Sequence, residues 1–212
     1  MTKYFKTNNV IVRRFEMKDV KQAYQNLSEE NNVIDSDKDS GKLDNVKNES
    51  IKFKGIENTK VIIKSAINEF YTDEPIWAVE DKKNKNLVGG IRVSNYSPKN
   101  RMCNISWRMS YKYCNDKFMK EALIQIFKFL FTKKSIELVE CSFFEQSQRN
   151  SLILEEIGMK KEAILRDRRI NEKTNKKENF VIYSINKQEF FDLLSQNKNM
   201  KSKVCKYMRI KV

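Results

Sequence analysis

Apolar and polar positions along this chain follow two periods, one typical of helices and one typical of strands. Helical spacing is strongest at residues 118–134, where the apolar residues form a single stripe. Runs rich in β-branched and aromatic residues separate the helical segments. The pattern predicts strands at 10–15, 76–81, 86–96, 102–111, 136–144, 162–170 and 179–185, and helices at 16–30, 59–73, 118–134, 147–158 and 187–196.

The order of these elements predicts an α/β fold with a mixed central sheet flanked by helices. Short turns separate the strands at 76–81, 86–96 and 102–111, so we expect an antiparallel meander there. The helix at 147–158 should end at Gly158, because glycine takes the positive φ of a helix C-cap without steric cost.

Residues 34–58 lose this periodicity and are rich in Asp, Ser, Lys and Asn, which predicts a long mobile loop. The next helix should begin with Thr59 as its N-cap. We expect one domain over residues 1–190, followed by the end of the last helix and a basic tail over 191–212.

The net charge of +14 is carried by 32 lysines and 10 arginines against 28 acidic residues. Two explanations of this charge remain open. The first is a generally basic surface, because an excess of lysine over arginine is typical of a chain encoded by an AT-rich genome. The second is a functional attraction to acidic partners, such as ribosomal RNA or an anionic cofactor. Because the sequence has no RNP-type or zinc-finger motif, we do not expect direct nucleic-acid binding.

Several classes of site are excluded by residue content. The chain has no histidine, which excludes His-based triads and His-ligated metals. Its four cysteines are scattered without a CxxC pair, so we expect reduced thiols and no metal site: Cys103, Cys114, Cys141 and Cys205. With neither an apolar run of about 18 residues nor a secretion signal at the start, we expect a cytoplasmic protein without a membrane span.

Four segments carry a resemblance to a known family: "LVGGIRV" (87–93), "FMKEALIQIFKFLF" (118–131), "LILEEIGMKKEAILRD" (152–167) and "VIYSINKQEF" (181–190). In this order and spacing they resemble the Gcn5-related N-acetyltransferase (GNAT) superfamily. They are most similar to the branch that contains the ribosomal-protein N-terminal acetyltransferases. The resemblance extends from about Val10 to Phe190, and it implies the GNAT fold and acetyl-CoA as the cofactor.

The resemblance implies that acetyl-CoA lies where the strands at 102–111 and 136–144 diverge. A Q/R-x-x-G-x-G/A loop at the start of the following helix would hold the pyrophosphate with backbone amides. Here Lys112 takes the Q/R position, while Asn115 and Lys117 replace the two glycines. Asp116 adds a carboxylate that repels a phosphate. The sequence leaves open whether this cofactor site is weakened or lost.

Further cofactor contacts follow from the same resemblance. The strand end offers its backbone to the pantetheine arm, and the family's Asn-x-x-Ser contact falls on Ser147 and Asn150, although Ser147 serves equally well as an N-cap. The expected cofactor-binding residues are Met109, Ser110, Tyr111, Lys112, Asn115, Asp116, Lys117, Phe118, Met119, Ser147 and Asn150.

The catalytic positions depart from the family as well. The strand carboxylate that many members use as a base is Asn104 here, which cannot take a proton, and the tyrosine used as an acid is Leu154. Glu145 is the nearest replacement carboxylate, and Tyr183 is a second candidate. Either residue is equally explained as ordinary polar surface or core.

Two functional hypotheses result. The first is an acetyl-CoA-dependent N-acetyltransferase that acts on the amine of a small molecule or a protein, including a protein N-terminus. The second is a degenerate GNAT-fold protein that serves as a binding or regulatory module, with the 34–58 loop and the basic tail as contact surfaces. A homodimer is compatible with both. A direct RNA binder rests on charge alone.

Overall fold

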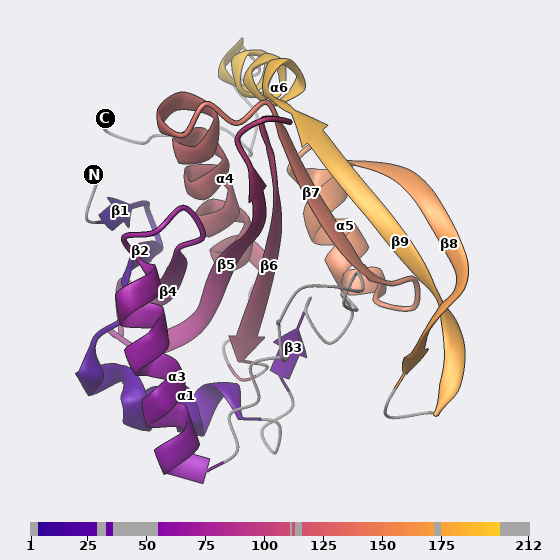
Figure 1. Cartoon of the computed structure of the whole chain (residues 1–212). Helices are drawn as coiled ribbons and strands as arrows, with labels where there is room; N and C mark the ends of the chain where they lie inside the picture. Colours follow the sequence, from indigo (N-terminus) through magenta and orange to yellow (C-terminus); the bar gives the residue numbers. More distant parts are fainter. Residues whose placement is uncertain are drawn as a thin grey trace.

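The computed structural model describes residues 4–28, 33–35, 55–110, 112, 116–171 and 175–199 (Figure 1). Most of the predicted loop, at 36–54, and the tail at 200–212 lie outside this part of the chain. The strands are β1 (Tyr4–Lys6), β2 (Val10–Arg14), β3 (Val33–Asp35), β4 (Ile76–Asp81), β5 (Leu87–Ser97), β6 (Met102–Ser110), β7 (Leu138–Phe144), β8 (Lys160–Asn171) and β9 (Lys176–Asn186). The helices are η1 (Met17–Asp19), α1 (Val20–Leu27), α3 (Gly55–Glu69), α4 (Asp116–Lys133), α5 (Gln148–Glu156) and α6 (Lys187–Asn199).

The described strands form a mixed sheet in the order β1-β2-β4-β5-β6-β7-β9-β8, with β3 paired to β6 off this path. The predicted meander is confirmed, because β4, β5 and β6 pair antiparallel in sequence. The pair of β6 and β7 is parallel, and the other described pairs are antiparallel. The predicted α/β fold with a mixed sheet is therefore confirmed.

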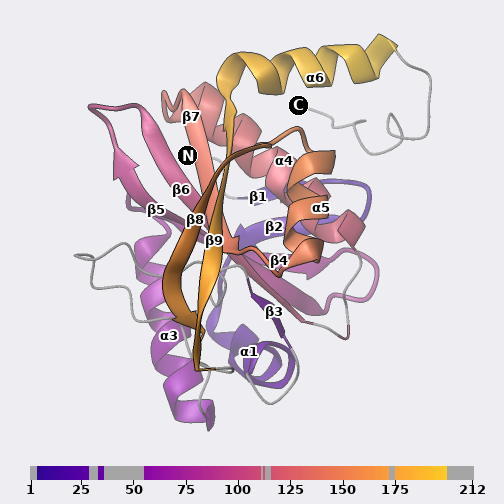
Figure 2. The same ribbon diagram turned by 90° about the vertical axis from the view of Figure 1, so that its right-hand side faces the viewer.

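Helices cover the two faces of the sheet differently. In Figure 2, α4 and α5 lie on one side and α3 on the other. Alternate residues of the central strands point to these two layers. Trp107 and its neighbours join the large apolar core with α4, while Ser106 and Arg108 line a pocket under α1 and α3. The α4 face is thus apolar, and the opposite face carries polar groups.

The feature that positions the site is the divergence of β6 and β7. These strands pair only from Met102 to Asn104 of β6 and from Leu138 to Glu140 of β7. Beyond these residues β6 runs on to Ser110, while β7 stays paired with β9 up to Phe144. The divergence of these two strands, which the family resemblance implied, is confirmed, and the paired part of β6 and β7 is parallel.

Close approach of β5 to β6 at this end depends on one glycine. Gly89 pairs with Met109, and a Cβ at Gly89 would lie 2.6 Å from the backbone oxygen of Arg108. That contact is shorter than any side chain tolerates, and a backbone atom cannot move aside locally. Gly89, the first glycine of the "GG" in the first family-like segment, therefore fixes how closely β6 is held along its end.

The structure corrects the predicted start of the second helix. Gly55 to Asn58 were assigned to the loop but form the first turn of α3, and all four are exposed. An exposed turn has no apolar periodicity, so the pattern could not reveal it. Thr59 is consequently not the N-cap; it is fully buried inside the helix, and its hydroxyl donates to the Gly55 oxygen at 2.8 Å.

Other parts of the prediction also differ from the structure. Strands β1 and β3 were missed because each has only three residues. The other end of the predicted loop is wrong as well, since Ile34 and Asp35 belong to β3. Finally, the helix expected at 16–30 consists of the short turn η1 followed by α1.

The C-cap prediction at Gly158 is confirmed. Gly158 has a φ of +91°, and its N–H donates to the Glu155 oxygen at 3.0 Å. The Met159 N–H donates to the Leu154 oxygen at 2.9 Å, which completes a Schellman motif.

The predicted end of the domain, at residue 190, lies inside α6. Phe190 is fully buried and packs against Phe127 and Phe131 of α4. Phe191 and Leu194 also pack against the core, so α6 is attached to the α4 face by its apolar residues.

We predict that Gly89→Ala lowers the free energy of unfolding by about 1–3 kcal/mol, because the added methyl overpacks against the β6 backbone. Gly90→Ala is the matched control. Its Cβ would lie 3.2 Å from the Phe15 ring, a side chain that can yield, so its cost should be smaller. Thermal or denaturant unfolding of both variants checks this, and an equal loss of stability would contradict it.

Candidate active site

The candidate site lies at the mouth between β6 and β7, where both strands lead into helices. Strand β6 is followed by α4, and β7 is followed by α5, so the N-termini of the two helices lie at the same edge of the sheet. Helix N-termini present unpaired backbone N–H groups and a partial positive charge. The fold thus places two electropositive helix ends beside the opening between the strands.

A salt bridge joins these two helix ends. The Arg149 Nε donates to Asp116 Oδ1 at 2.7 Å, and Nη2 lies 2.6 Å from the same oxygen. Both side chains are partly exposed. Asp116 is the first residue of α4, where a carboxylate is stabilised by the helix dipole. The repulsive charge expected from the sequence is therefore paired with an arginine that the sequence did not indicate.

Lys120, one turn further along α4, forms a second salt bridge with Glu156 of α5, in which α4 supplies the cation and α5 the anion. This ammonium group is therefore engaged with α5. Lys117 is half-buried in the first turn of α4, and Lys112 is exposed after the end of β6.

The structure gathers the described cofactor candidates around this mouth. Met109 and Ser110 end β6, and both are buried. Phe118 is partly buried and Met119 fully buried, because they turn from the first helical turn into the α4 core. Tyr111 and Asn115 lie outside the described residues.

The two candidates on α5 have different environments. Ser147 is the N-cap residue, but its side chain makes no capping hydrogen bond. Asn150 is fully buried, and its backbone N–H donates to the Ser147 oxygen at 3.0 Å. Ser147 is partly exposed and Asn150 is fully buried, so Ser147 is the more accessible of the two to a bound molecule.

Both sequence-predicted catalytic residues have structural partners. Glu145 accepts a hydrogen bond from the Asn179 side chain at 2.9 Å. Tyr183 is fully buried on the α4 face, stacks on Phe143, and donates from its hydroxyl to Glu155 Oε1 at 2.8 Å. Burial raises the pKa of the Tyr183 phenol, and the bond to the Glu155 carboxylate acts in the same direction.

Glu140 is a further carboxylate at this site that the sequence did not indicate. It is the direct register partner of Asn104 on β6 and of Ser184 on β9, so its side chain lies on the polar face at the last paired position before the strands diverge. Ser184 Oγ donates to Glu162 Oε1 at 2.6 Å, which brings a second carboxylate to this face. Burial raises the pKa of Glu140, and the negative charge of Glu162 raises it further.

One sequence signal could have found Glu140. In the strand "LVECSFF" the polar residues Glu140 and Ser142 alternate with buried apolar residues. This alternation indicates that one face of the strand does not pack in the hydrophobic core. Without the register, however, nothing paired Glu140 with Asn104.

A pocket opens on the same face of the sheet, beneath α1 and α3. Leu27, Ile63 and Ala66 line its helical wall, and Ser106 and Arg108 line its floor. Arg108 Nη1 donates to the Leu27 oxygen at 3.0 Å, which ties β6 to the end of α1. The pocket is mainly apolar and lies on the half of β6 that β7 has left.

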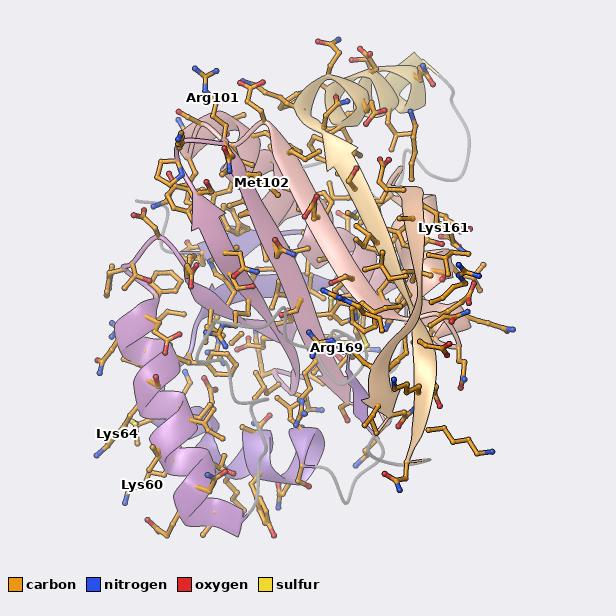
Figure 3. The ribbon with its side chains drawn as sticks, turned by 45° about the vertical axis from the view of Figure 1, so that its right-hand side comes forward. Lys60, Lys64, Arg101, Met102, Lys161 and Arg169 are labelled. Atoms are coloured by element: carbon orange, nitrogen blue, oxygen red, sulfur yellow. The ribbon has the colours of Figure 1, made fainter. Side chains whose placement is uncertain are left out.

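In the part of the chain that the structure describes, basic side chains also lie far from this mouth. Lys60 and Lys64 extend outward from α3, and Lys161 lies on β8 at the far side of the sheet (Figure 3). This distribution favours a generally basic surface over a single anion-binding patch.

Two further classes of site are not seen in the described part of the chain. Its acidic and cysteine side chains form no group that could hold a metal ion. None of its helices is long and apolar enough to cross a membrane.

The sequence profile described as an acetyltransferase (GNAT) domain matches residues 9–160. The chain belongs to the GNAT acetyltransferase family. The match spans β2 to the start of β8 and so includes the divergence of β6 and β7 and both helix ends at the mouth. A search of curated protein sequences finds no match to this chain.

Solved structures show the same fold at low sequence identity. A GNAT-family acetyltransferase from Bacillus anthracis is 19% identical with a TM-score of 0.69, covering 88% of this chain and 99% of that one. The ribosomal-protein-S5-alanine acetyltransferase from Vibrio fischeri is 14% identical with a TM-score of 0.67, covering 88% and 98%. The microcin C7 self-immunity acetyltransferase MccE, in complex with acetyl-CoA and AMP, is 9% identical with a TM-score of 0.65, covering 85% and 93%.

For a GNAT protein the group expected at the mouth is acetyl-CoA, and the described residues fit it in outline. The helix ends, Lys117 and Arg149 suit a pyrophosphate, and the edge of β6 suits a chain that bears amides. Two features oppose binding. Asp116 places an anion at the α4 terminus, and β3 already pairs with the end of β6.

We predict that Glu140→Gln stabilises the protein at neutral pH. A carboxyl whose pKa is raised in the folded state is penalised when both states are ionised, and glutamine removes that penalty. As the pH falls towards the ordinary carboxyl pKa, the folded protein takes up the proton first and the penalty disappears. Thermal unfolding from pH 7.5 to pH 4 should therefore show a gain in Tm that shrinks with acidity. A constant or growing gain would contradict the assignment.

Proposed function

We propose that this protein is an acetyl-CoA-dependent N-acetyltransferase that acts on an amine, with a protein N-terminus as one class of acceptor. The observation that carries the proposal is the divergence of β6 and β7 directly beside the N-termini of α4 and α5. That arrangement places the end of β6, which β3 pairs along this edge, and two positive helix ends at one opening. A binding module would need neither a polar face at the base of the opening nor a carboxylate on it.

Each part of the cofactor has a matching part of the site. Acetyl-CoA would supply an acetyl group activated as a thioester. The first turn of α4, Lys117 and Arg149 would hold the pyrophosphate, and the backbone of Met109 and Ser110 would hold the pantetheine arm. Met119 and Phe118 support this turn from the core.

Glu140 is the best-placed proton acceptor among the described residues. It lies beside Asn104, the position that the family resemblance assigns to a base, at the point where β6 and β7 separate. A carboxylate with a raised pKa takes a proton from an ammonium group more readily than an ordinary carboxylate. Glu140 would therefore accept the proton of the acceptor amine, a role for which Glu145 and Tyr183 are the competing candidates.

The acceptor would approach from the α1 and α3 face, where the pocket under α3 lies next to the polar base of the opening. Its apolar wall of Leu27, Ile63 and Ala66 suits an apolar side chain on the acceptor. The resemblance to the ribosomal-protein acetyltransferase branch supports a protein N-terminus, because its first side chain would be available to fill such a pocket.

Calorimetric titration with acetyl-CoA tests the cofactor site. We expect the parent to bind and Asp116→Asn to bind about fivefold tighter, since removing a partly exposed charge is worth about 1 kcal/mol. The neutral residue removes the repulsion and releases Arg149 towards the phosphates. Arg149→Gln should weaken binding, because Asp116 is then left without this partner. No heat from the parent or from either variant would reject the enzyme and favour the degenerate binding module.

The glycine replacements give an independent comparison. If the loop residues only weaken the site sterically, Asn115→Gly combined with Lys117→Gly should tighten acetyl-CoA binding. Weaker binding by this double variant would identify Lys117 as a phosphate ligand, in agreement with its place in the first turn of α4.

For catalysis we predict that Glu140→Gln lowers kcat/KM by roughly a hundredfold or more, the usual contribution of a general base. The acidic limb of the pH profile should be lost with it, and acetyl-CoA affinity should stay close to that of the parent. Asn104→Asp added to Glu140→Gln should recover part of the activity by restoring a carboxylate at the neighbouring position. A larger loss in Glu145→Gln or Tyr183→Phe than in Glu140→Gln would transfer the role to that residue.

A further inference from the structure

The end of β6 has two edges, and both are paired. Strand β5 follows one edge throughout, with Gly89 opposite Met109 and Gly90 opposite Arg108. The other edge belongs to β7 only as far as Asn104. Further along, at the end of β6, β3 takes this edge, since Val33, Ile34 and Asp35 pair antiparallel with Ser110, Met109 and Arg108. A short internal strand thus sits in the gap that β7 leaves.

This gap is where the backbone of β6 would receive the pantetheine arm. A pantetheine arm contains two amide groups and pairs with a strand edge as an extended peptide does. The N–H and C=O groups that point out of one edge can serve only one partner strand at a time. Because β5 holds the opposite edge, the arm and β3 require the same groups.

We propose that Val33–Asp35 is an internal competitor for the pantetheine arm, so that acetyl-CoA engages fully only when this strand leaves β6. The inference rests on the proposed function, because it presumes that acetyl-CoA is a ligand. It adds a property that neither the fold nor the family supplies. This chain blocks its own cofactor edge with a segment that follows α1.

The size of β3 suits a reversible device. A pairing of three residues is too short to be stable by itself, and it is maintained because the chain tethers it beside β6. Only the five residues 28–32 lie between the end of α1 and the start of β3 in the sequence. Acetyl-CoA binds fully only to the state in which β3 has left β6. The apparent Kd for acetyl-CoA therefore rises by the inverse of the fraction of molecules in that state. A strand bound for nine-tenths of the time would weaken binding about tenfold.

A pair of matched variants and a pair of matched ligands test the competition by calorimetry. Val33→Gly combined with Ile34→Pro lowers strand propensity and removes a backbone donor, whereas Ile34→Val keeps a β-branched residue. Acetyl-CoA contains the arm, and 3′-phosphoadenosine 5′-diphosphate lacks it. We expect the double variant to bind acetyl-CoA about threefold to tenfold tighter. It should bind the nucleotide as the parent does, and Ile34→Val should match the parent with both ligands.

Hydrogen exchange supplies a second readout. On addition of acetyl-CoA to the parent, the amides of residues 33–35 should exchange faster, while those of residues 108–110 stay protected by the new partner. Equal acetyl-CoA affinity in parent and double variant, or unchanged protection of 33–35 in the bound protein, would overturn the competition and leave the proposed function intact. Tighter binding of 3′-phosphoadenosine 5′-diphosphate by the double variant would also overturn it, since the gain in affinity would then not involve the pantetheine arm. Absence of acetyl-CoA binding in every form would instead remove the proposed function together with this inference.

Discussion

The hydrogen-bonding capacity of β6 governs the rest of this structure. A strand in the middle of a sheet must satisfy N–H and C=O groups on both edges, and β7 satisfies only the first three residues of one of them. At the far end of β6, Arg108, Met109 and Ser110 pair with β3 in this protein, whereas the GNAT fold makes the same end of the strand available to a cofactor. Strand divergence, the position of the site and the role of β3 all follow from that single shortfall in pairing.

Electrostatics at the mouth follow from where the two strands lead. Both β6 and β7 lead into helices whose N-termini lie there, and each N-terminus contributes a partial positive charge. The chain adds an anion of its own, Asp116, and balances it with Arg149. Such a partly exposed pair costs little to separate, so the α4 terminus can exchange one anion for another. The loss of both loop glycines changes how closely a phosphate can approach, but it leaves the helix ends in place.

The chemistry of the site depends on the face opposite α4. On that face the polar residues of β6, β7 and β9 lie beside the pocket under α1 and α3, while the α4 face is filled by apolar core. Asn104 cannot act as a base, yet its register partner Glu140 can, because parallel neighbours share one face of a sheet. If Glu140 acts as the base, the role that the family places on β6 lies on the adjacent strand here, without a change of fold.

The sequence by itself determined the α/β class, the meander and the C-cap at Gly158. Each of these depends on local periodicity or on a single residue type, which are properties that a linear pattern contains. The separation of β6 from β7 was implied by the family resemblance of four segments. The sequence also pointed to the region of the candidate site, since the family-like segments carry the strand ends and helix starts. It did not reveal β3, because three residues are too few to show alternation. Nor did it reveal the partner of Asp116 or the role open to Glu140. Those depend on which strand lies beside which, and at what register, and only tertiary packing decides that.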